Sequence, residues 1–364
     1  MRTWNYANFL EDRSIEYAAL YCGGKSLGDV CPDSIKDTWD DVYGRMLAFY
    51  RAIHEARVDL NENCFYDLVP ESFLRDFCEI KNKITEHVFE NYEKPPNYDL
   101  LLEVQKILSE IQVRPLNLEF SALRSKLHQY KTRNWHEKIK KADPYISYNL
   151  FGTKTGRLTT KRGSFPALTL PKEYRGIVRP TNEWFLELDF NSAEIRTLLA
   201  LAGNEQPKED IHEWNIKHVF KTDMSRDEAK KNIFAWLYNP AAESPATKFY
   251  DRDKIKKQYW DGEMVRTEFG REIESDDHHA VNYIIQSTTS DLFLRRMVAV
   301  NELLKTKQSH IAFCVHDSLV IDLHSDDKHL VPLIKETFGD TDLGKFKVNL
   351  SAGKNYGEMQ ELSL

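Results

Sequence analysis

Two aspartates lie at the ends of apolar segments, where an unpaired charge is costly. Asp189 follows the apolar run of residues 184–188, and Asp317 lies at the tight turn of an apolar hairpin predicted over residues 310–323. A carboxylate at the end of a buried strand is unfavourable unless it is paired or binds a cation. Two of them on neighbouring strands would form an oxygen-rich site suited to Mg²⁺, and two such ions about 4 Å apart can activate a hydroxyl and stabilise a leaving phosphate. The alternative is that Asp189 caps the following helix and Asp317 is only a turn residue.

A second set of residues has the composition of a nucleotide-binding surface. Two cations and two aromatic residues recur at every fourth position and so share one side of a predicted helix: Arg226, Lys230, Phe234 and Tyr238. The cations would neutralise a triphosphate, and the aromatic rings would offer flat surfaces to sugar and base. The alternative is an amphipathic surface helix with aromatic residues in the core and solvated cations.

Charge is distributed unevenly along the chain. Residues 121–180 hold 14 basic and three acidic residues, a net charge of +11, whereas residues 1–120 and 181–364 each carry a net charge of −9. The formal charge of the whole chain, −7, is therefore an average. A local cluster of Lys and Arg is sufficient for binding a polyanion, although a solvated basic face gives the same pattern.

The composition excludes several classes of protein. With 364 residues, of which 41% are hydrophobic and 29% charged, the chain is expected to fold into about two or three units. No apolar run approaches the roughly 20 residues of a membrane span, and the N-terminus lacks the apolar core of a signal peptide. Five cysteines without a CxxC pair indicate free thiols in a reducing compartment, and neither a disulfide framework nor a zinc site.

The elements that must position these residues can be placed coarsely. Residues 1–45 are weakly patterned, and residues 66–140 predict amphipathic helices that are interrupted at Pro95–Pro96. Residues 145–180 are rich in loops. Residues 184–190 predict a buried strand that leads into a helix.

The second half of the chain is predicted to be mostly helical before the hairpin. Residues 208–240 predict helix, residues 241–262 are polar and irregular, and residues 276–307 predict one long helix. The two β-rich runs of residues 310–323 flank His316–Asp317–Ser318 and predict a hairpin.

In their order along the chain these segments resemble the motifs of the family A, polymerase-I-like DNA polymerases. LDFNSAEIR (188–196) is similar to DYSQIELR, the usual form of motif A. The spacing of four residues from Arg226 to Tyr238 matches motif B, and CVHDSLVI (314–321) is similar to motif C. Further matches are TGRLTT (155–160), DIH (210–212), Asn282-x3-Gln286 and the closing GKNYG (353–357). The resemblance spans about residues 45–360.

The resemblance implies a role for each matched residue. Asp189, Asp317 and the backbone carbonyl of Phe190 would bind two Mg²⁺ ions, with Mn²⁺ as an alternative, and the catalytic residues would be Asp189, Asp317 and Lys230. The incoming dNTP would contact Arg226, Lys230, Phe234, Tyr238, His212 and Glu194, where Glu194 closes off the ribose 2′-hydroxyl. DNA would contact Arg157, Asn282, Gln286 and His316.

The family also implies an α+β fold shaped as a right hand, with an antiparallel palm sheet, a helical thumb and helical fingers. The expected division is an N-terminal extension (1–45, a possible remnant of an exonuclease domain), a palm entry helix (46–65), the thumb (66–140), the palm with motif A (141–200), the fingers with motif B (201–268) and the palm with motif C (269–364). Residues 1–45 are too short for a 3′–5′ exonuclease domain, so no proofreading is expected from this chain.

The expected partners are primer-template DNA and dNTPs, with a separate exonuclease, helicase or processivity factor as candidates. We expect the protein to be a monomer that is not associated with a membrane. We expect it to be located in the cytoplasm of a bacterium or of a phage-infected host cell. A compact and divergent version of the family favours a phage source.

Three departures from the family pattern bear on function. Ser318 stands where motif C usually has glutamate, and Ala235 and Asn239 replace two glycines of motif B. The form HDS is that of single-subunit, phage-type RNA polymerases, which makes RNA synthesis the first alternative; Glu194 argues against it. The second alternative is a catalytically inactive DNA-binding relic, which the retained Asp189 and Asp317 disfavour.

Overall fold

The computed structural model describes residues 1–8, 10, 14–60, 62–239 and 242–363. It contains two compact units, Met1–Leu102 and Glu103–Leu364. Their boundary lies in helix α4 (Tyr98–Gln112), and so inside the range 66–140 that was expected to be one thumb. None of the described helices combines the length and the apolar character that crossing a membrane requires.

The N-terminal unit is built on two long helices, α2 (Lys36–Glu55) and α3 (Glu71–Asn91). Around them lie β1 (Arg2–Thr3), β2 (Glu16–Tyr17), α1 (Ala18–Tyr21), η1 (Asp33–Ile35) and η2 (Phe65–Leu68). The expectation of a weakly patterned extension over residues 1–45 is wrong for the described part, because Trp4 and Trp39 are buried in one core with Phe73 and Ile84 of α3. Trp4 and Trp39 are too far apart in the sequence to give a periodic hydrophobic pattern, although both side chains belong to the core around α3.

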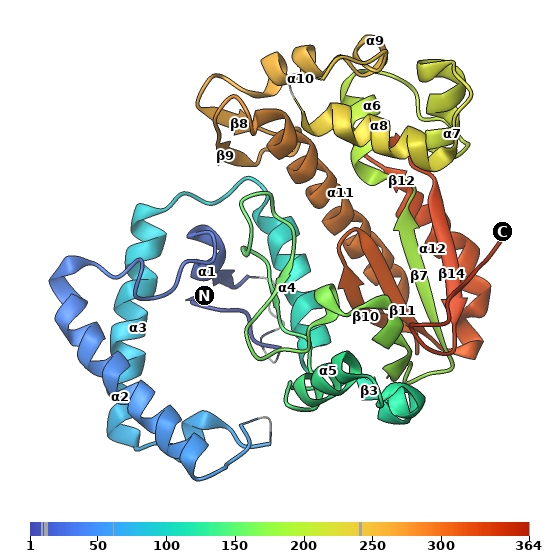
Figure 1. Ribbon diagram of the computed structural model, residues 1–364. Coiled ribbons are helices and arrows are strands. Elements are labelled where there is room, and N and C mark those ends of the chain that lie inside the picture. The colour runs from blue at the N-terminus through green and yellow to red at the C-terminus, as the bar shows by residue number, and fades with distance from the viewer. Residues whose placement is uncertain (9, 11–13, 61, 240–241, 364) are drawn as a thin grey trace. The chain divides into compact units, whose positions relative to one another are not determined.

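A five-stranded sheet forms the centre of the C-terminal unit (Figure 1). Its strand order is β10 (His310–Val315), β11 (Ser318–Leu323), β7 (Trp184–Phe190), β14 (Val348–Gly353) and β15 (Gln360–Glu361). Every neighbouring pair is antiparallel, as predicted for this sheet, and β7 spans the predicted residues. The predicted hairpin is β10–β11, which turns at His316–Asp317.

The two faces of this sheet serve different purposes. On one face Phe190 stacks on Phe338 of α12 (Val331–Gly339), with ring centroids 4.3 Å apart, and α11 (Ala280–Leu304) packs on α12 through Phe293. Successive strand residues point to opposite faces, so Asp189 points away from this core. The apolar face therefore anchors the strand whose other face presents the carboxylate.

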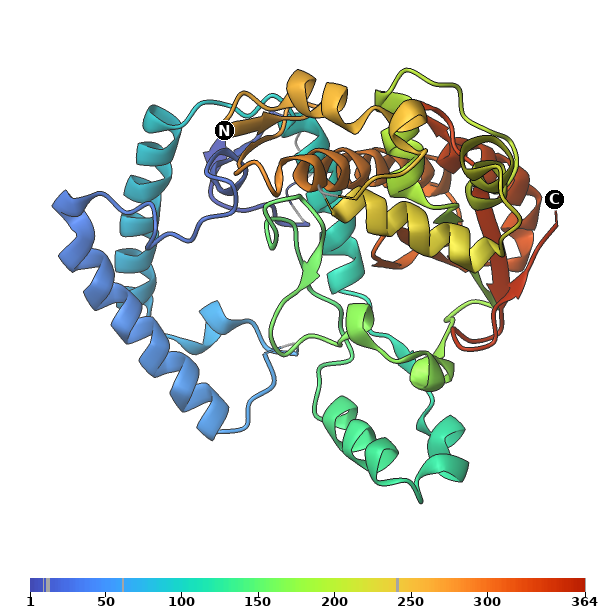
Figure 2. The same ribbon diagram turned by 45° about the horizontal axis from the view of Figure 1, so that its top comes forward.

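A helical cluster follows β7. It comprises α6 (Ala193–Leu201), α7 (Ile211–Asn215), the π-helical turn η6 (Ile216–Phe220), α8 (Arg226–Tyr238), α9 (Thr247–Tyr250), α10 (Arg252–Tyr259), β8 (Met264–Arg266) and β9 (Glu272–Glu274). Both views show α8 beside α7 (Figures 1 and 2). These elements share an apolar core with the N-terminal part of α11.

The expectation that residues 241–262 are irregular is wrong for the described part, which contains α9 and α10. Tyr250 and Ile255 are completely buried and hold these short helices in the core. Arg252 donates to the carbonyls of Trp236 and Asn239 at 2.5 and 3.0 Å, and so satisfies acceptors at the C-terminal end of α8. A buried arginine thereby supplies hydrogen-bond donors at the end of this helix.

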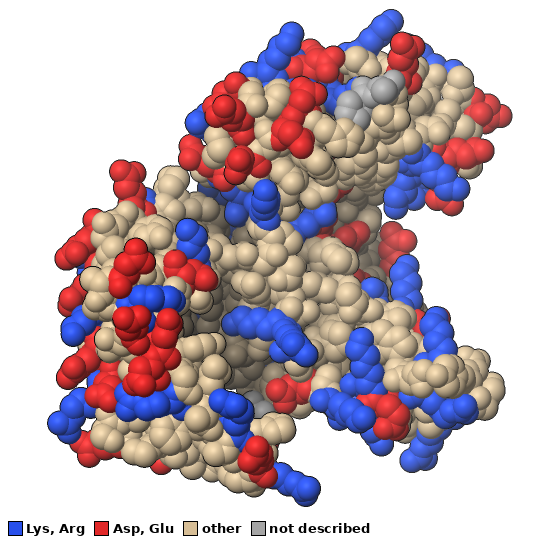
Figure 3. All heavy atoms as spheres, turned by 60° about the vertical axis from the view of Figure 1, so that its left-hand side comes forward, with Lys and Arg blue, Asp and Glu red and all other residues tan. Residues whose placement is uncertain are grey.

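The segment before β7 consists of short elements, as expected from its loop-rich sequence. They are β3 (Asn117–Leu118), η3 (Phe120–Lys126), α5 (Tyr130–Lys140), β4 (Tyr148–Asn149), β5 (Thr159–Thr160), η4 (Ala167–Thr169), η5 (Lys172–Ile177) and β6 (Val178–Arg179). The remaining elements of the unit are η7 (Ser325–Leu330), β12 (Asp340–Thr341) and β13 (Gly344–Lys345). Over the face drawn in Figure 3, acidic and basic side chains are interspersed.

One buried tyrosine joins this segment to the sheet. The Tyr148 hydroxyl donates to the Cys314 carbonyl at 2.6 Å and accepts from the Cys314 N–H at 2.9 Å. Cys314 lies in β10, an edge strand of the sheet, two residues before the turn that carries Asp317. The hydroxyl thus satisfies two backbone groups for which the sheet offers no neighbour.

Replacing Tyr148 with phenylalanine should lower the free energy of unfolding by about 1–3 kcal/mol, because it leaves a buried donor and a buried acceptor without a partner. Urea denaturation of the full chain measures the change. Tyr130→Phe is the matched control, since Tyr130 is 72% exposed. Equal stability of the Tyr148 variant and this control would contradict the role given to the hydroxyl.

Candidate active site

The antiparallel pairing of β11 with β7 brings the two predicted carboxylates together. Ser318 is the register partner of Asp189, and Asp317 is the neighbour of Ser318 at the hairpin turn. The Ser318 hydroxyl donates to Oδ1 of Asp189 at 2.9 Å. The adjacent His316 is exposed and has a left-handed backbone, with φ of 54°.

Burial and like charges act on both carboxylates. Burial raises the pKa of Asp317 to about 6; the Arg157 cation opposes this rise, and the charges of Glu194 and Asp189 add to it. Burial also raises the pKa of Asp189, against hydrogen bonds from Ser318 and Asn349 and the positive charge of Lys230. Two carboxylates that are costly to ionise together form a site that gains from a bound cation.

The direction of the Asp317 shift fixes a dependence of stability on pH. An Asp whose folded pKa is raised binds its proton more tightly in the folded state, so its ionisation disfavours folding above about pH 6. In metal-free buffer at pH 8, Asp317→Asn should therefore raise the free energy of unfolding by about 1–3 kcal/mol. The gain should shrink as the pH falls from 8 through 6 to 4.5, because the wild-type carboxyl then becomes protonated.

Thermal or urea denaturation across this pH range measures the effect. Asp342→Asn is the control, because Asp342 is exposed in the turn between β12 and β13. An Asp317→Asn gain that is the same at pH 4.5 and pH 8 would rule out the electrostatic origin.

Glu194 joins the loop of Arg157 to the end of α8. It lies in the first turn of α6, is 8% exposed, and accepts hydrogen bonds from the Arg157 guanidinium and from the Tyr238 hydroxyl on different oxygens. Burial and the Glu194 charge raise the pKa of Tyr238, so its hydroxyl remains a donor. The carboxylate is thus held from two sides.

The loop that carries Arg157 contains a glycine in the left-handed backbone conformation, which lies against the side chain of Arg271. Gly156 has φ of +77°, and the Arg271 guanidinium leaves no room for a Cβ there. Arg271 in turn pairs with Asp291 of α11, which is buried, through two hydrogen bonds of 3.1 and 2.5 Å.

The four residues of the expected nucleotide-binding face all lie on α8. The helix begins with a capping box in which Ser225 and Glu228 bond each other's backbone. Arg226 donates to Asp210 at 2.7 Å, and Lys230 is exposed, with its charge acting on Asp189. Phe234 and Tyr238 lie parallel, with ring centroids 6.0 Å apart.

His212, which the resemblance implies as a contact of the incoming dNTP, lies inside the protein. It is completely buried, and its Nε2 is hydrogen-bonded to the Ser192 hydroxyl at 2.6 Å. Burial lowers its pKa to about 4, with Arg226 and Lys230 acting in the same direction against Asp210. Without a bound anion the imidazole is therefore neutral at physiological pH, and its ring packs beside Phe234.

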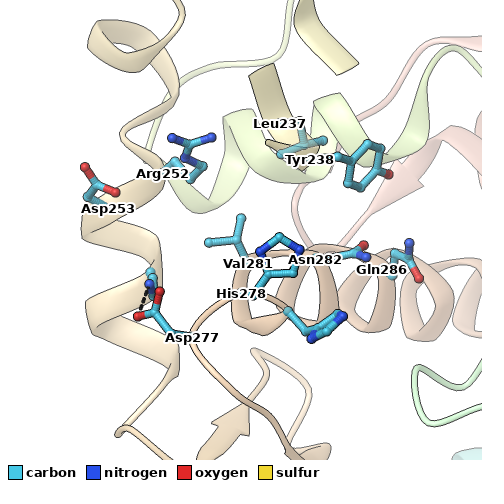
Figure 4. A pocket seen from close by; sticks show the side chains of 11 residues that line it. Leu237, Tyr238, Arg252, Asp253, Asp277, His278, Val281, Asn282 and Gln286 are labelled. Atoms are coloured by element: carbon cyan, nitrogen blue, oxygen red, sulfur yellow. Dashed lines mark hydrogen bonds and ion pairs between the residues drawn. The ribbon is translucent and has the colours of Figure 1, made fainter. Parts of the chain in front are cut away.

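Gln286 and Asn282 of α11 line a cavity of about 420 Å³ together with Tyr238 (Figure 4). Arg252 and Asp253 of α10 line another side of it, and His278 lies at the start of α11. The Asn282 side-chain oxygen is buried and has no hydrogen-bond partner among the described residues. The cavity thus combines an aromatic ring with amide groups that have hydrogen-bonding capacity to spare.

The C-terminal part of the chain matches a known family. Residues 263–360, which include α11 and the hairpin that carries Asp317, match the model of DNA polymerase family A. This segment is therefore similar to DNA polymerase family A. None of the curated proteins compared with the chain by sequence matches it significantly.

A solved structure is similar in fold to nearly the whole chain. The POL domain of Pol1 from M. smegmatis, solved in complex with DNA primer-template and dNTP, superposes with a TM-score of 0.62 at 13% sequence identity. The match covers 94% of this chain and 82% of that chain. The family match is confined to residues 263–360, whereas the solved structure shows a similar fold over nearly the whole chain.

Several residues that build this site were not predicted from the sequence. Asn191 and Arg196 form a buried hydrogen-bonded frame behind Asp189, and Arg271 supports the Arg157 loop. Glu187 shares a face of β7 with Asp189 and is hydrogen-bonded by Ser351. A charged residue in an apolar strand is a signal for Glu187, whereas only the fold reveals the partners of Arg196 and Arg271.

Proposed function

We propose that the protein is a template-directed DNA polymerase that adds dNTPs to a primer 3′ end by nucleotidyl transfer. The observation that carries the proposal is the pairing of β7 with β11, in which Ser318, the neighbour of Asp317, is the register partner of Asp189, while the charge of Lys230 on α8 acts on Asp189. The family A match and the likeness to a polymerase domain support the same reaction. In this proposal the five-stranded sheet is the palm, and the cluster from α7 to α10 forms the fingers.

The donor set fits Mg²⁺. Among the described residues no group of three or more His, Cys, Asp and Glu side chains is arranged to hold a metal, so the protein would offer the two carboxylates Asp189 and Asp317, with the backbone carbonyl of Phe190. Oxygen-only ligand sets with few protein ligands are typical of Mg²⁺, which also takes oxygens from substrate phosphates and water. When bound, two ions would acidify the primer 3′-hydroxyl and stabilise the charge of the leaving pyrophosphate. Mn²⁺ has the same ligand preference.

The chain's own residues would bind and orient the triphosphate. Arg226 and Lys230 would offset its charge, and Lys230, the exposed cation that faces Asp189, would donate a proton to the leaving pyrophosphate. Phe234 and Tyr238 would carry the sugar and base on their parallel rings. Glu194, fixed by Arg157 and Tyr238, would occupy the space that a ribose 2′-hydroxyl needs.

The DNA side of the proposal uses the remaining predicted residues. Arg157 and Gln286 would contact minor-groove acceptors that all correct base pairs share, so base selection comes from template pairing. Asn282 and Gln286 would meet the template in the cavity beside Tyr238. The basic segment 121–180 would contact phosphates, and His316 would lie near the primer end.

RNA synthesis is the second candidate, because Ser318 gives motif C the form HDS. In the structure Ser318 hydrogen-bonds Asp189 and so supports a carboxylate rather than supplying one. The fixed position of Glu194 favours deoxyribonucleotides.

Primer extension with dNTPs and with rNTPs in Mg²⁺, using Asp189→Ala as the control, tests the proposal. We expect templated extension with dNTPs by the wild type alone. Efficient extension with rNTPs would favour RNA synthesis. Binding of primer-template without incorporation in Mg²⁺ or in Mn²⁺ would indicate a DNA-binding relic.

A further inference from the structure

The loop before α7 contains a carboxylate that already binds one of the cations assigned to substrate. Asp210 caps α7 through Oδ1, which accepts from the N–H groups of His212 and Glu213 at 2.9 and 3.2 Å. Its other oxygen, Oδ2, accepts from Arg226 at 2.7 Å and from the Asn191 amide at 2.7 Å. Asp210 thus connects the start of α7 to the start of α8.

The Asp210 side of this contact is rigidly built. Asn191 is 3% exposed, and its Oδ1 accepts from the Ile211 N–H at 2.9 Å and from Arg196 at 3.0 Å. Arg196 is completely buried and donates to the carbonyls of Pro207 and Glu209 at 2.9 and 2.8 Å. The loop that carries Asp210 is therefore fixed to the end of β7, two residues beyond Asp189.

The Arg226 side is open. The Arg226 side chain is 45% exposed, whereas that of Asp210 is 14% exposed. Burial raises the pKa of Asp210, but hydrogen bonds from Arg226, Asn191 and the Glu213 N–H, together with the Arg226 charge, outweigh it and hold the pKa far below its usual range. Asp210 is consequently an anion at every pH at which the protein would work.

We propose that Asp210 is a positioning residue that occupies Arg226 until the triphosphate of an incoming nucleotide displaces it. The inference rests on the proposed function, since it takes Arg226 to be a triphosphate ligand. Carboxylate and phosphate oxygens bind the same guanidinium donors, so the two anions compete for Arg226. Before nucleotide binds, the ion pair ties the start of α8 to the frame behind Asp189. The free energy of nucleotide binding then includes the cost of breaking the ion pair between Asp210 and Arg226.

Asp210→Asn tests the competition with little change in structure, because asparagine retains the volume and the helix-capping acceptor and loses the charge. We expect the Kd of the complementary dNTP to fall three- to tenfold, measured by equilibrium binding in Mg²⁺ to the full-length protein on a primer-template whose primer lacks a 3′-hydroxyl. Asp210→Ser, a second neutral cap, should give the same tightening. Thermal denaturation checks that both variants are folded.

Two further variants separate competition from general repulsion of the triphosphate. Asp227→Asn removes a charge that also acts on Arg226, but one that does not hydrogen-bond it, and should change the Kd less than twofold. In an Arg226→Gln background, Asp210→Asn should likewise have less than a twofold effect. A tightening that persists without Arg226 would overturn the competition.

The outcome also distinguishes this inference from the proposed function. Wild-type protein that does not prefer the complementary dNTP over the other three would contradict the proposed function. Wild-type protein that has this preference, together with neutral variants whose Kd is unchanged or weaker, would contradict the role of Asp210 alone.

Discussion

Replacing Asp317 with alanine should lower Mg²⁺-dependent primer extension by at least about 10³-fold, which corresponds to about 4 kcal/mol of transition-state stabilisation. Asp317 lies at the hairpin turn beside Ser318, the register partner of Asp189, and burial raises its pKa, so its ionised form gains from a bound cation. No neighbouring side chain replaces it, because Ser318 holds the position at which the family usually has glutamate. Asp189→Ala should have an effect of the same size.

The control for both variants is Asp342→Ala, which removes an exposed carboxylate in a turn of the same unit and should leave extension within about twofold of wild type. Binding of primer-template, measured by fluorescence anisotropy, should also stay within about twofold for the Asp317 variant, because phosphate contacts come from the basic residues. Near-normal extension by either the Asp189 or the Asp317 variant would contradict the assignment of these residues to metal binding.

The second large effect is expected for Glu194→Ala, which should raise the use of rNTPs relative to dNTPs by about 10²-fold. The side chain is buried beside the start of α6 and held by Arg157 and Tyr238, so it cannot move aside for a 2′-hydroxyl without breaking a charged pair. Alanine removes the obstruction and leaves the strand that carries Asp189 intact. The ratio of kcat/KM for a matched rNTP and dNTP on one template measures the change.

Glu205→Ala, an exposed glutamate beyond the end of α6, is the matched control and should leave the ratio unchanged. Glu194→Gln is informative as well, because it retains the volume but weakens the hold of Arg157. We expect it to raise rNTP use less than alanine does. An unaltered ratio in Glu194→Ala would show that another residue excludes the 2′-hydroxyl.

Much of the core of the site could be predicted from the sequence because it depends on local patterns. The run of residues 184–190 has the apolar character of a buried strand, and the spacing of Arg226 and Tyr238 by multiples of four defines one face of a helix. The hairpin around Asp317 follows from two β-rich runs on either side of a short polar turn. Each of these patterns lies within one continuous segment of the chain, so contacts between distant segments are not needed to recognise it.

What could not be predicted depends on contacts between distant segments. His212 is a potential cation by type, but burial beside Ser192 makes it neutral, and no local signal reports that burial. Within this polar segment, residues 247–250 and 252–259 form helices because Tyr250 reaches a core that is formed by other segments. Asp210 is likewise an ordinary helix cap in the sequence, and only the fold brings Arg226 to its second oxygen.

The double hydrogen bond of Tyr148 has a consequence for the behaviour of the protein in concentrated solution. An exposed edge strand with free N–H and C=O groups is a template on which another chain can add a strand, which leads to aggregation. On β10 the Tyr148 hydroxyl occupies both groups of Cys314, and the register of β10 shifts between Ile311 and Phe313, which interrupts the regular spacing of the same strand. The hairpin that presents Asp317 is thereby protected from edge-to-edge association with a second molecule, without an additional strand to cover it.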